Sequence, residues 1–152
     1  MKVKLLMMLG WVLVFAENDA EKQLIKLYPR QAEMAVGVKF EVEKMTVDRF
    51  GRNTKKDESD AFRHFVGAGL LYKRLGPELA EKFLAAHETG PGNTKAERQM
   101  DKDNNALALK VAAEMDKKGE LTPEKLAEKA MALIQSGELV VLEKRTKLEI
   151  RK

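Results

Sequence analysis

The two histidines of the sequence each have an acidic neighbour at a spacing that suits acid–base chemistry. Asp60 and His64 are four residues apart, which places their side chains on the same face of a helix. A carboxylate in contact with an imidazole fixes the tautomer of the ring and raises its basicity, as a general base or a metal ligand requires. His87 is followed directly by Glu88. We therefore take Asp60, His64, His87 and Glu88 as the candidate catalytic residues.

A third polar group combines Asp101 with Asn104 and Asn105, three and four positions further on. Asparagine is a poor helix former, so its place in a stretch that otherwise favours helix indicates that tertiary hydrogen bonds stabilise it. Arg63 offers a positive charge beside His64 for an anionic group. We expect these residues to bind substrate: Arg63, Asp101, Asn104 and Asn105. The simplest packing turns all three polar groups toward one shared site.

Each group also has a structural interpretation. Asp60 and His64 could form a buried pair, and His87 could interact with the negative end of a helix dipole. The group around Asp101 could pin the loop at residues 90–93. The concentration of all three groups within residues 60–105 favours a common function.

The sequence does not assign a metal ligand or a cofactor. A divalent metal could be drawn to His64, His87 and Asp101, but no spacing enforces such a site. The His-Glu pair at residues 87–88 lacks the second histidine of a zinc-binding His-Glu-x-x-His helix.

Several other chemistries are excluded by residue type. The sequence has no cysteine, which excludes disulfides, thiol nucleophiles and cysteine-ligated zinc. Neither Ser59 nor Ser136 lies in a Gly-x-Ser-x-Gly turn, and no phosphate-binding Gly-x-x-x-x-Gly-Lys-Ser/Thr loop is present. Histidines and carboxylates therefore remain as the available catalytic groups.

The elements that must position these residues are predicted to be helices. Apolar residues at helical spacing, with capping residues, glycines and prolines at the breaks, predict a mainly α, single compact domain of about five to six helices. The alternating valines around residues 36–42 leave strand or helix open there. The last segment, around Arg145, is compatible with a small C-terminal β-hairpin. The expected helices cover residues 19–28, 31–45, 59–75, 77–87, 95–118 and 123–136, the last of them capped by Thr122.

Residues 1–16 have the composition of a secretory signal peptide. Lys2 and Lys4 precede an apolar run that reaches residue 15, and Ala16 offers a small residue for cleavage. The run is about half as long as the roughly 20 residues that a spanning helix needs. We predict a secreted or periplasmic protein whose mature chain, residues 17–152, is one helical domain without a membrane segment. An uncleaved anchor and a buried core helix are the alternatives.

The charge balance argues against nucleic acid as a partner. The sequence has 28 Lys+Arg and 24 Asp+Glu, and cleavage after Ala16 would remove two lysines and no acid. The small excess of positive charge that remains is too weak to drive binding to the phosphate backbone of a nucleic acid. We expect a cell-envelope component or a small anionic substrate instead; the sequence does not set the oligomeric state.

Three sequence blocks resemble a bacterial domain family of unknown function that occurs in secreted proteins and at the C-termini of toxin-like or wall-associated proteins. The resemblance covers about residues 53–113 and departs from the family pattern at Phe65 and Ala108. It implies export and a helical fold with a site lined by His, Asp and Asn, and it implies no particular reaction. The blocks are Asp60-Ala61-Phe62-Arg63-His64, Ala86-His87-Glu88, and Met100-Asp101 with Asn104-Asn105.

Two functions fit these residues. The first is a hydrolase or toxin-like effector that acts at the cell envelope, with His64 as general base and Arg63 on an anionic group. A phosphodiester or phospholipid suits these residues better than a sugar, since the only tryptophan, Trp11, leaves with the signal peptide. The alternative is a non-enzymatic exported binding or interaction protein, in which the polar cluster is a buried structural network.

Overall fold

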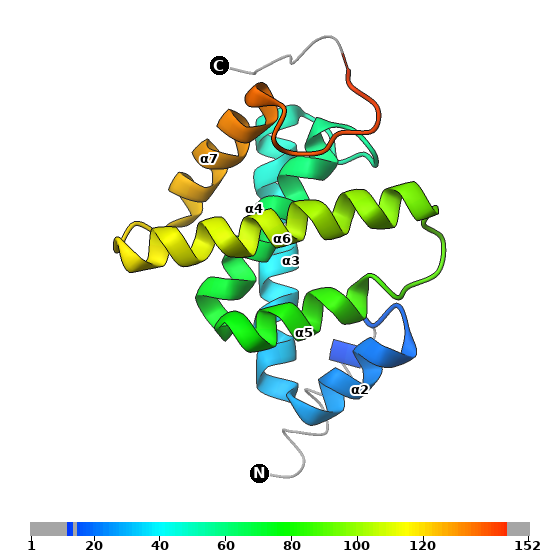
Figure 1. Ribbon diagram of the computed structural model, residues 1–152. Helices are drawn as coiled ribbons and strands as arrows, with labels where there is room; N and C mark the ends of the chain where they lie inside the picture. Colours follow the sequence, from blue (N-terminus) through cyan, green and yellow to red (C-terminus); the bar gives the residue numbers. More distant parts are fainter. Residues whose placement is uncertain (1–11, 14, 146–152) are drawn as a thin grey trace.

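The protein is built from helices that pack around one central helix. The computed structural model describes residues 12–13 and 15–145. Within these residues it contains no strand, which confirms the prediction of a mainly helical single domain (Figure 1). The helices are α2 (Asp19–Leu27), α3 (Pro29–Phe50), α4 (Glu58–Leu75), α5 (Pro77–His87), α6 (Lys95–Lys117) and α7 (Pro123–Ser136).

Helix α4 is the centre of the fold because it packs against α3, α5, α6 and α7. Its apolar stripe recurs at helical spacing, and the side chains of Phe62, Phe65, Val66 and Leu70 are all fully buried. Helix α6 crosses α4 in Figure 1, and α5 lies beside both. Polar residues on the first half of α4 are therefore held next to α6.

The helix ends follow signals that are readable in the sequence. Asp57 caps α4 by accepting hydrogen bonds from the backbone N–H groups of Ser59 and Asp60. Gly76 has a φ of 81°, a conformation that favours glycine, and it turns the chain from α4 directly into α5. This tight turn places the C-terminal end of α5 close to α2 and α6.

Helix α3 runs to Phe50 and resolves the ambiguity around its valines. Val38 and Val42 are four residues apart on one helix face and are buried in the main core. Val36 packs on a second apolar cluster, while Phe40 points outward and makes an edge contact with the Phe15 ring. The strand-like alternation thus arises because α3 has apolar partners on two sides.

The expected C-terminal β-hairpin is not present in the residues that can be described. Leu142 and Glu143 both donate their backbone N–H groups to the carbonyl of Lys56. The backbone of Val140 is bonded to the side chain of Asn104. Residues 139–145 therefore use their hydrogen-bonding groups against the domain instead of a strand partner, and the second half of the predicted hairpin lies outside the described residues.

The described end of the predicted signal peptide packs against the domain. Val12 is buried in an apolar cluster with Ile25 and Val36, and Phe15 packs at the edge of this cluster. No helix among the described residues has the length and apolar character that crossing a membrane requires. Residues 1–11 and 14 lie outside the described part, so cleavage after Ala16 stays a prediction.

The contact between α4 and α7 predicts opposite effects for two neighbouring glycines. A Cβ atom at Gly69 would lie 2.7 Å from Cδ2 of Leu126, a fully buried side chain, whereas at Gly67 the nearest atom, Cγ1 of Val42, is 3.6 Å away. We expect Gly69→Ala to lower the free energy of unfolding by about 1–3 kcal/mol through overpacking. Gly67→Ala should raise it by up to about 1 kcal/mol through helix propensity. Urea denaturation measures both, and equal effects would contradict this packing.

Candidate functional site

The imidazole of His64 bridges two buried carboxylates on different helices. Its Nε2 atom lies 3.4 Å from Oδ1 of Asp60 on α4 and 3.2 Å from Oδ1 of Asp101 on α6. The side chain of His64 is 12% exposed and each carboxylate side chain is 6% exposed. The structure thus brings together two of the three polar groups that the sequence singled out.

Asp60 has further partners that favour its ionised form. Arg63 donates a hydrogen bond to Oδ1 of Asp60, and the backbone N–H of Lys56 donates to Oδ2 at 2.6 Å. Burial alone raises the pKa of Asp60, but the hydrogen bond and charge of His64, with the charge of Arg63, outweigh it and lower the pKa. Asp60 is therefore the carboxyl group at this site that ionises most readily.

The pKa values of Asp101 and Glu88 are shifted in the opposite direction, above their ordinary values. Burial raises the pKa of Asp101, and the nearby charge of Asp60 adds to this rise. Burial also raises the pKa of Glu88, with a second contribution from the charge of Asp101. Neighbouring carboxyl groups whose pKa values are driven apart can divide the roles of acid and base between them.

Asn105 connects the end of α5 to this cluster. Its Nδ2 atom donates to Oε1 of Glu88 at 3.2 Å. Its Oδ1 atom, like Oδ1 of Asp101, is buried without a hydrogen-bond partner among the described residues. Buried polar atoms of this kind are uncommon in folded proteins and are frequent where a site has a functional role. We name the set Asp60, Arg63, His64, Glu88, Asp101 and Asn105 the His64 cluster.

Asn104 has a different role from its neighbour. Its amide forms two hydrogen bonds with the backbone of Val140, from Nδ2 to the carbonyl at 2.9 Å and from the N–H to Oδ1 at 2.8 Å. This exchange pins the C-terminal segment to α6. The structure therefore does not bring Asn104 into the His64 cluster, although the sequence grouped it with Asn105.

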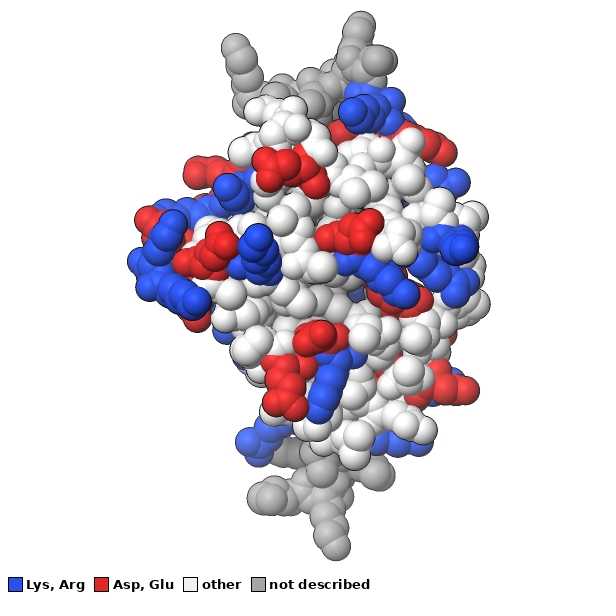
Figure 2. Space-filling model, in the orientation of Figure 1, with Lys and Arg blue, Asp and Glu red and all other residues white. Residues whose placement is uncertain are grey.

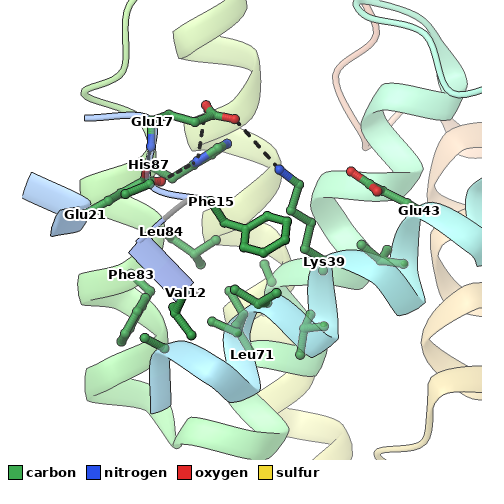
Figure 3. Close-up of a pocket in the computed structure, with 18 of the residues that line it drawn as sticks. Val12, Phe15, Glu17, Glu21, Lys39, Glu43, Leu71, Phe83, Leu84 and His87 are labelled. Atoms are coloured by element: carbon green, nitrogen blue, oxygen red, sulfur yellow. Dashed lines mark hydrogen bonds and ion pairs between the residues drawn. The ribbon is translucent and has the colours of Figure 1, made fainter. Parts of the chain in front are cut away.

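His87, at the end of α5, faces α2 and the segment before it. Its Nδ1 atom is 2.8 Å from Oε1 of Glu21 and 3.9 Å from Oε2 of Glu17 (Figure 3). The hydrogen bond to Glu21 raises the pKa of His87 above its ordinary value despite the opposing effect of burial. His87 therefore favours the cationic form, and none of its observed ion pairs involves the His64 cluster.

A cavity of about 320 Å³ connects the two histidines. It lies between α3, α4, α5 and the segment before α2, and most of its lining is apolar (Figure 3). Arg63 and His64 border it from α4, His87 borders it from α5, and Lys39 borders it from α3. The His64 cluster thus reaches open space through Arg63 and His64, while Asp101 stays behind them.

Within the part of the chain that the structure describes, one group of side chains has the spacing to hold a metal ion. Ligand atoms of Asp60, His64 and Asp101 all lie within 4.8 Å of one another. The sequence offers His64, His87 and Asp101 as possible ligands. In the structure, Asp60 takes the place of His87 in this group. Arg63 already binds Oδ1 of Asp60, so a divalent cation would have to compete with a guanidinium group there. We assign no metal to the site.

A second buried ionic group supports the start of α4, and the sequence did not single it out as a network. The carboxylate of Asp57 is fully buried and contacts Nε of Arg52 at 3.0 Å and Nε of Arg145 at 3.2 Å. Glu58 accepts a hydrogen bond from the backbone N–H of Arg145. Sequence spacing does not indicate this network, because the approach of Arg145 to Asp57 depends on the tertiary fold.

The fold and these contacts define a small helical domain with a histidine–carboxylate site between its central helices. Residues 22–138 match the family DUF6973, a domain of unknown function, and the chain belongs to this family. The match confirms an uncharacterised domain family, and it extends well beyond residues 53–113. No curated protein and no solved structure matches the chain.

The Asp57 network predicts a loss of stability in acid. Although burial alone raises its pKa, hydrogen bonds from Ser59, Thr54 and Arg52 lower the pKa of Asp57 from 3.8 to about 2. A lowered pKa stabilises the fold above the unfolded-state value, and this contribution is lost as the pH falls from roughly 4 to 2. We expect Asp57→Asn to cost roughly 2 kcal/mol at neutral pH and to flatten this pH dependence.

Denaturant unfolding at pH 7, 4 and 2 measures this effect. The matched control is Asp116→Asn, which changes an exposed carboxylate on α6. If Asp57→Asn and Asp116→Asn show the same stability and the same pH dependence, the Asp57 network does not anchor α4.

Proposed function

We propose that this domain is a hydrolase that acts on an anionic ester at the cell envelope, with His64 as its general base. The observation that carries the proposal is the double contact of His64. Its Nε2 atom faces the carboxylates of Asp60 and Asp101, while the side chain borders the cavity. Because the two nearest polar atoms are carboxylate oxygens, we assign the hydrogen of the neutral ring to Nε2, and Nδ1 then keeps the lone pair that takes a proton.

The carboxylates around His64 would divide two tasks. Ionised Asp60 orients the ring and stabilises the imidazolium that forms when His64 takes a proton from water. Asp101 and Glu88, whose pKa values are raised by burial, hold protons more readily; neither borders the cavity, so a proton from them reaches a leaving group through His64. Asn105 positions Glu88 through the hydrogen bond from Nδ2.

The proposed anion-binding groups are Arg63 and His87; the carboxylates of Glu17, Glu21 and Glu43 border the same cavity, so a phosphate or similar anion would bind at these two cations only. Arg63 borders the cavity beside His64, and His87 favours its cationic form on the facing wall. Guanidinium and imidazolium groups both donate hydrogen bonds to phosphate oxygens. The apolar remainder of the lining suits a phospholipid or an apolar phosphodiester better than a sugar.

The surface charges agree with a small substrate. Figure 2 shows Lys and Arg side chains interspersed with Asp and Glu on this face, without one continuous patch of either sign. Binding along a nucleic acid requires a basic surface that follows the phosphates. We therefore propose a compact anionic substrate that the exported protein, in the manner of a toxin-like effector, meets outside the cytoplasm.

A non-enzymatic exported binding protein is the second candidate. The observation in its favour is burial, because the residues Asp60, Glu88 and Asp101 are each less than one-tenth exposed. In that case the cluster would act as a polar network that selects one packing of α4, α5 and α6. Loss of His64 would then leave Asp60 and Asp101 without their shared partner and would cost roughly 1–3 kcal/mol of stability.

Turnover and stability measured on the same variants separate the two functions. Probes are bis(p-nitrophenyl) phosphate and vesicles of dioleoyl phosphatidylglycerol, assayed with the purified wild type. For a hydrolase, we expect His64→Gln to reduce turnover at least about 100-fold, with the melting temperature within a few degrees of the wild type. Glutamine keeps a polar side chain near Asp60 and Asp101, which limits the structural cost.

A matched pair of acidic variants tests the location of the site on α6. Asp101→Asn should reduce turnover because it removes a carboxylate from His64, whereas Asp103→Asn changes an exposed carboxylate two residues away and should not. No turnover of either probe by the wild type, with a large drop in the melting temperature of His64→Gln, would favour the binding protein instead; turnover by His64→Gln at the wild-type rate would contradict the role of His64 as general base.

A further inference from the structure

Glu21 joins the predicted cleavage point to His87. Its Oε2 atom accepts a hydrogen bond from the backbone N–H of Glu17 at 2.6 Å. Its other oxygen, Oε1, lies 2.8 Å from Nδ1 of His87 (Figure 3). The Glu21 side chain is only 15% exposed. A largely buried carboxylate therefore sits against the one backbone nitrogen that cleavage after Ala16 would convert into an amino terminus.

The position of this nitrogen depends on contacts that follow Ala16 in the chain. Asn18 caps α2 through its side-chain oxygen, which accepts from the backbone N–H of Glu21 at 3.0 Å. The amide of Asn18 also donates to the carbonyl of Ala86 at 2.9 Å, at the end of α5. These bonds do not involve residues 12–16, so the geometry around Glu17 does not require that the preceding segment remain attached.

We propose that the chain is processed between Ala16 and Glu17 and that Glu21 binds the new α-ammonium group. Hydrolysis adds the hydroxyl of water to the carbonyl carbon of Ala16 and a hydrogen to the nitrogen of Glu17, which then takes up a further proton from solvent. The resulting group has three hydrogens and a positive charge where the precursor has one N–H. The neutral hydrogen bond to Glu21 becomes a charge-assisted one.

Some of the other charges near Glu17 would attract the new α-ammonium group, and others would repel it. Lys39 lies 3.9 Å from Oε1 of Glu17, and His87 faces both Glu17 and Glu21. These cations oppose the new ammonium group, while the carboxylates of Glu17 and Glu21 favour it. Glu21 is in direct hydrogen-bond contact with the nitrogen, so its attraction is the strongest of these effects.

Processing would also change the cavity. Val12, Phe15 and Ala16 form part of its wall, and all three would leave with residues 1–16. The cavity that contains both histidines would lose its cover on this side. The same cleavage would thus anchor the new terminus beside His87 and widen the approach to His64, whether or not the site is a hydrolase.

The test begins with the full chain, expressed from Met1 in bacteria that export it. Mass spectrometry of the exported protein should give Glu17 as the first residue. The rate at which an amine-specific reagent modifies the Glu17 α-amino group is then compared at pH 7 with the rate for a free peptide of residues 17–26. We expect the folded protein to react at least several-fold more slowly, because an ammonium group that is paired with a carboxylate is not nucleophilic.

Variants of the same full chain assign the protection to Glu21. Glu21→Gln should bring the modification rate close to that of the peptide, and Glu21→Asp should give an intermediate rate. Glu33→Gln, which changes an exposed carboxylate on α3, should leave the wild-type rate unchanged. An intact Met1, a different first residue, or a wild-type amine as reactive as the peptide would each overturn the proposal, without bearing on turnover by His64.

Discussion

The contact of His64 with two carboxylates from different helices is the constraint on which the rest of the structure depends. Ionised carboxylates lose several kcal/mol of hydration when they are buried, and pairing must offset that loss. At Asp60 the offset comes from His64, Arg63 and the N–H of Lys56. At Asp101, Nε2 of His64 lies 3.2 Å from Oδ1, and among the described residues no hydrogen bond reaches this oxygen, so the pairing is incomplete.

Small residues make this contact geometrically feasible. Ala61 on α4 and Ala108 and Ala112 on α6 are fully buried in the main core, and the two helices pack directly against each other. The apolar half of α4 packs on α7 through Gly69 and Leu126, which leaves its first half to carry the polar side chains. Five of the six residues of the His64 cluster lie on the helices α4 and α6, which suits a preorganised site.

Much of the scaffold was predictable because its signals are local. The helix over residues 95–118, the cap at Thr122 and the break at Gly76 follow from capping and breaker residues within a few positions. The described residues do not support the possible C-terminal hairpin, because strand-like composition does not reveal that Asn104 and Lys56 supply the hydrogen bonds. That pairing joins residues that are 36 or more positions apart.

The sequence could indicate which residues belong to the site, but not how all of them are arranged in space. Spacing placed Asp60 beside His64, and the meeting with Asp101 followed from turning polar groups toward one another. Spacing could not tell Asn104 from Asn105, since their different directions depend on where the C-terminal segment lies. It also could not show that His87 turns to Glu21, a residue 66 positions earlier, instead of joining the His64 cluster.

Carbethoxylation of histidine in the native protein tests the central claim that His64 is a reachable base. His87 serves as the internal reference, because its side chain is 44% exposed. The account predicts that diethyl pyrocarbonate modifies His64 in the folded protein at pH 7, with peptide mapping by mass spectrometry as the readout. Modification of His64 only after unfolding in denaturant would show that the ring is sealed between the helices and would contradict the account.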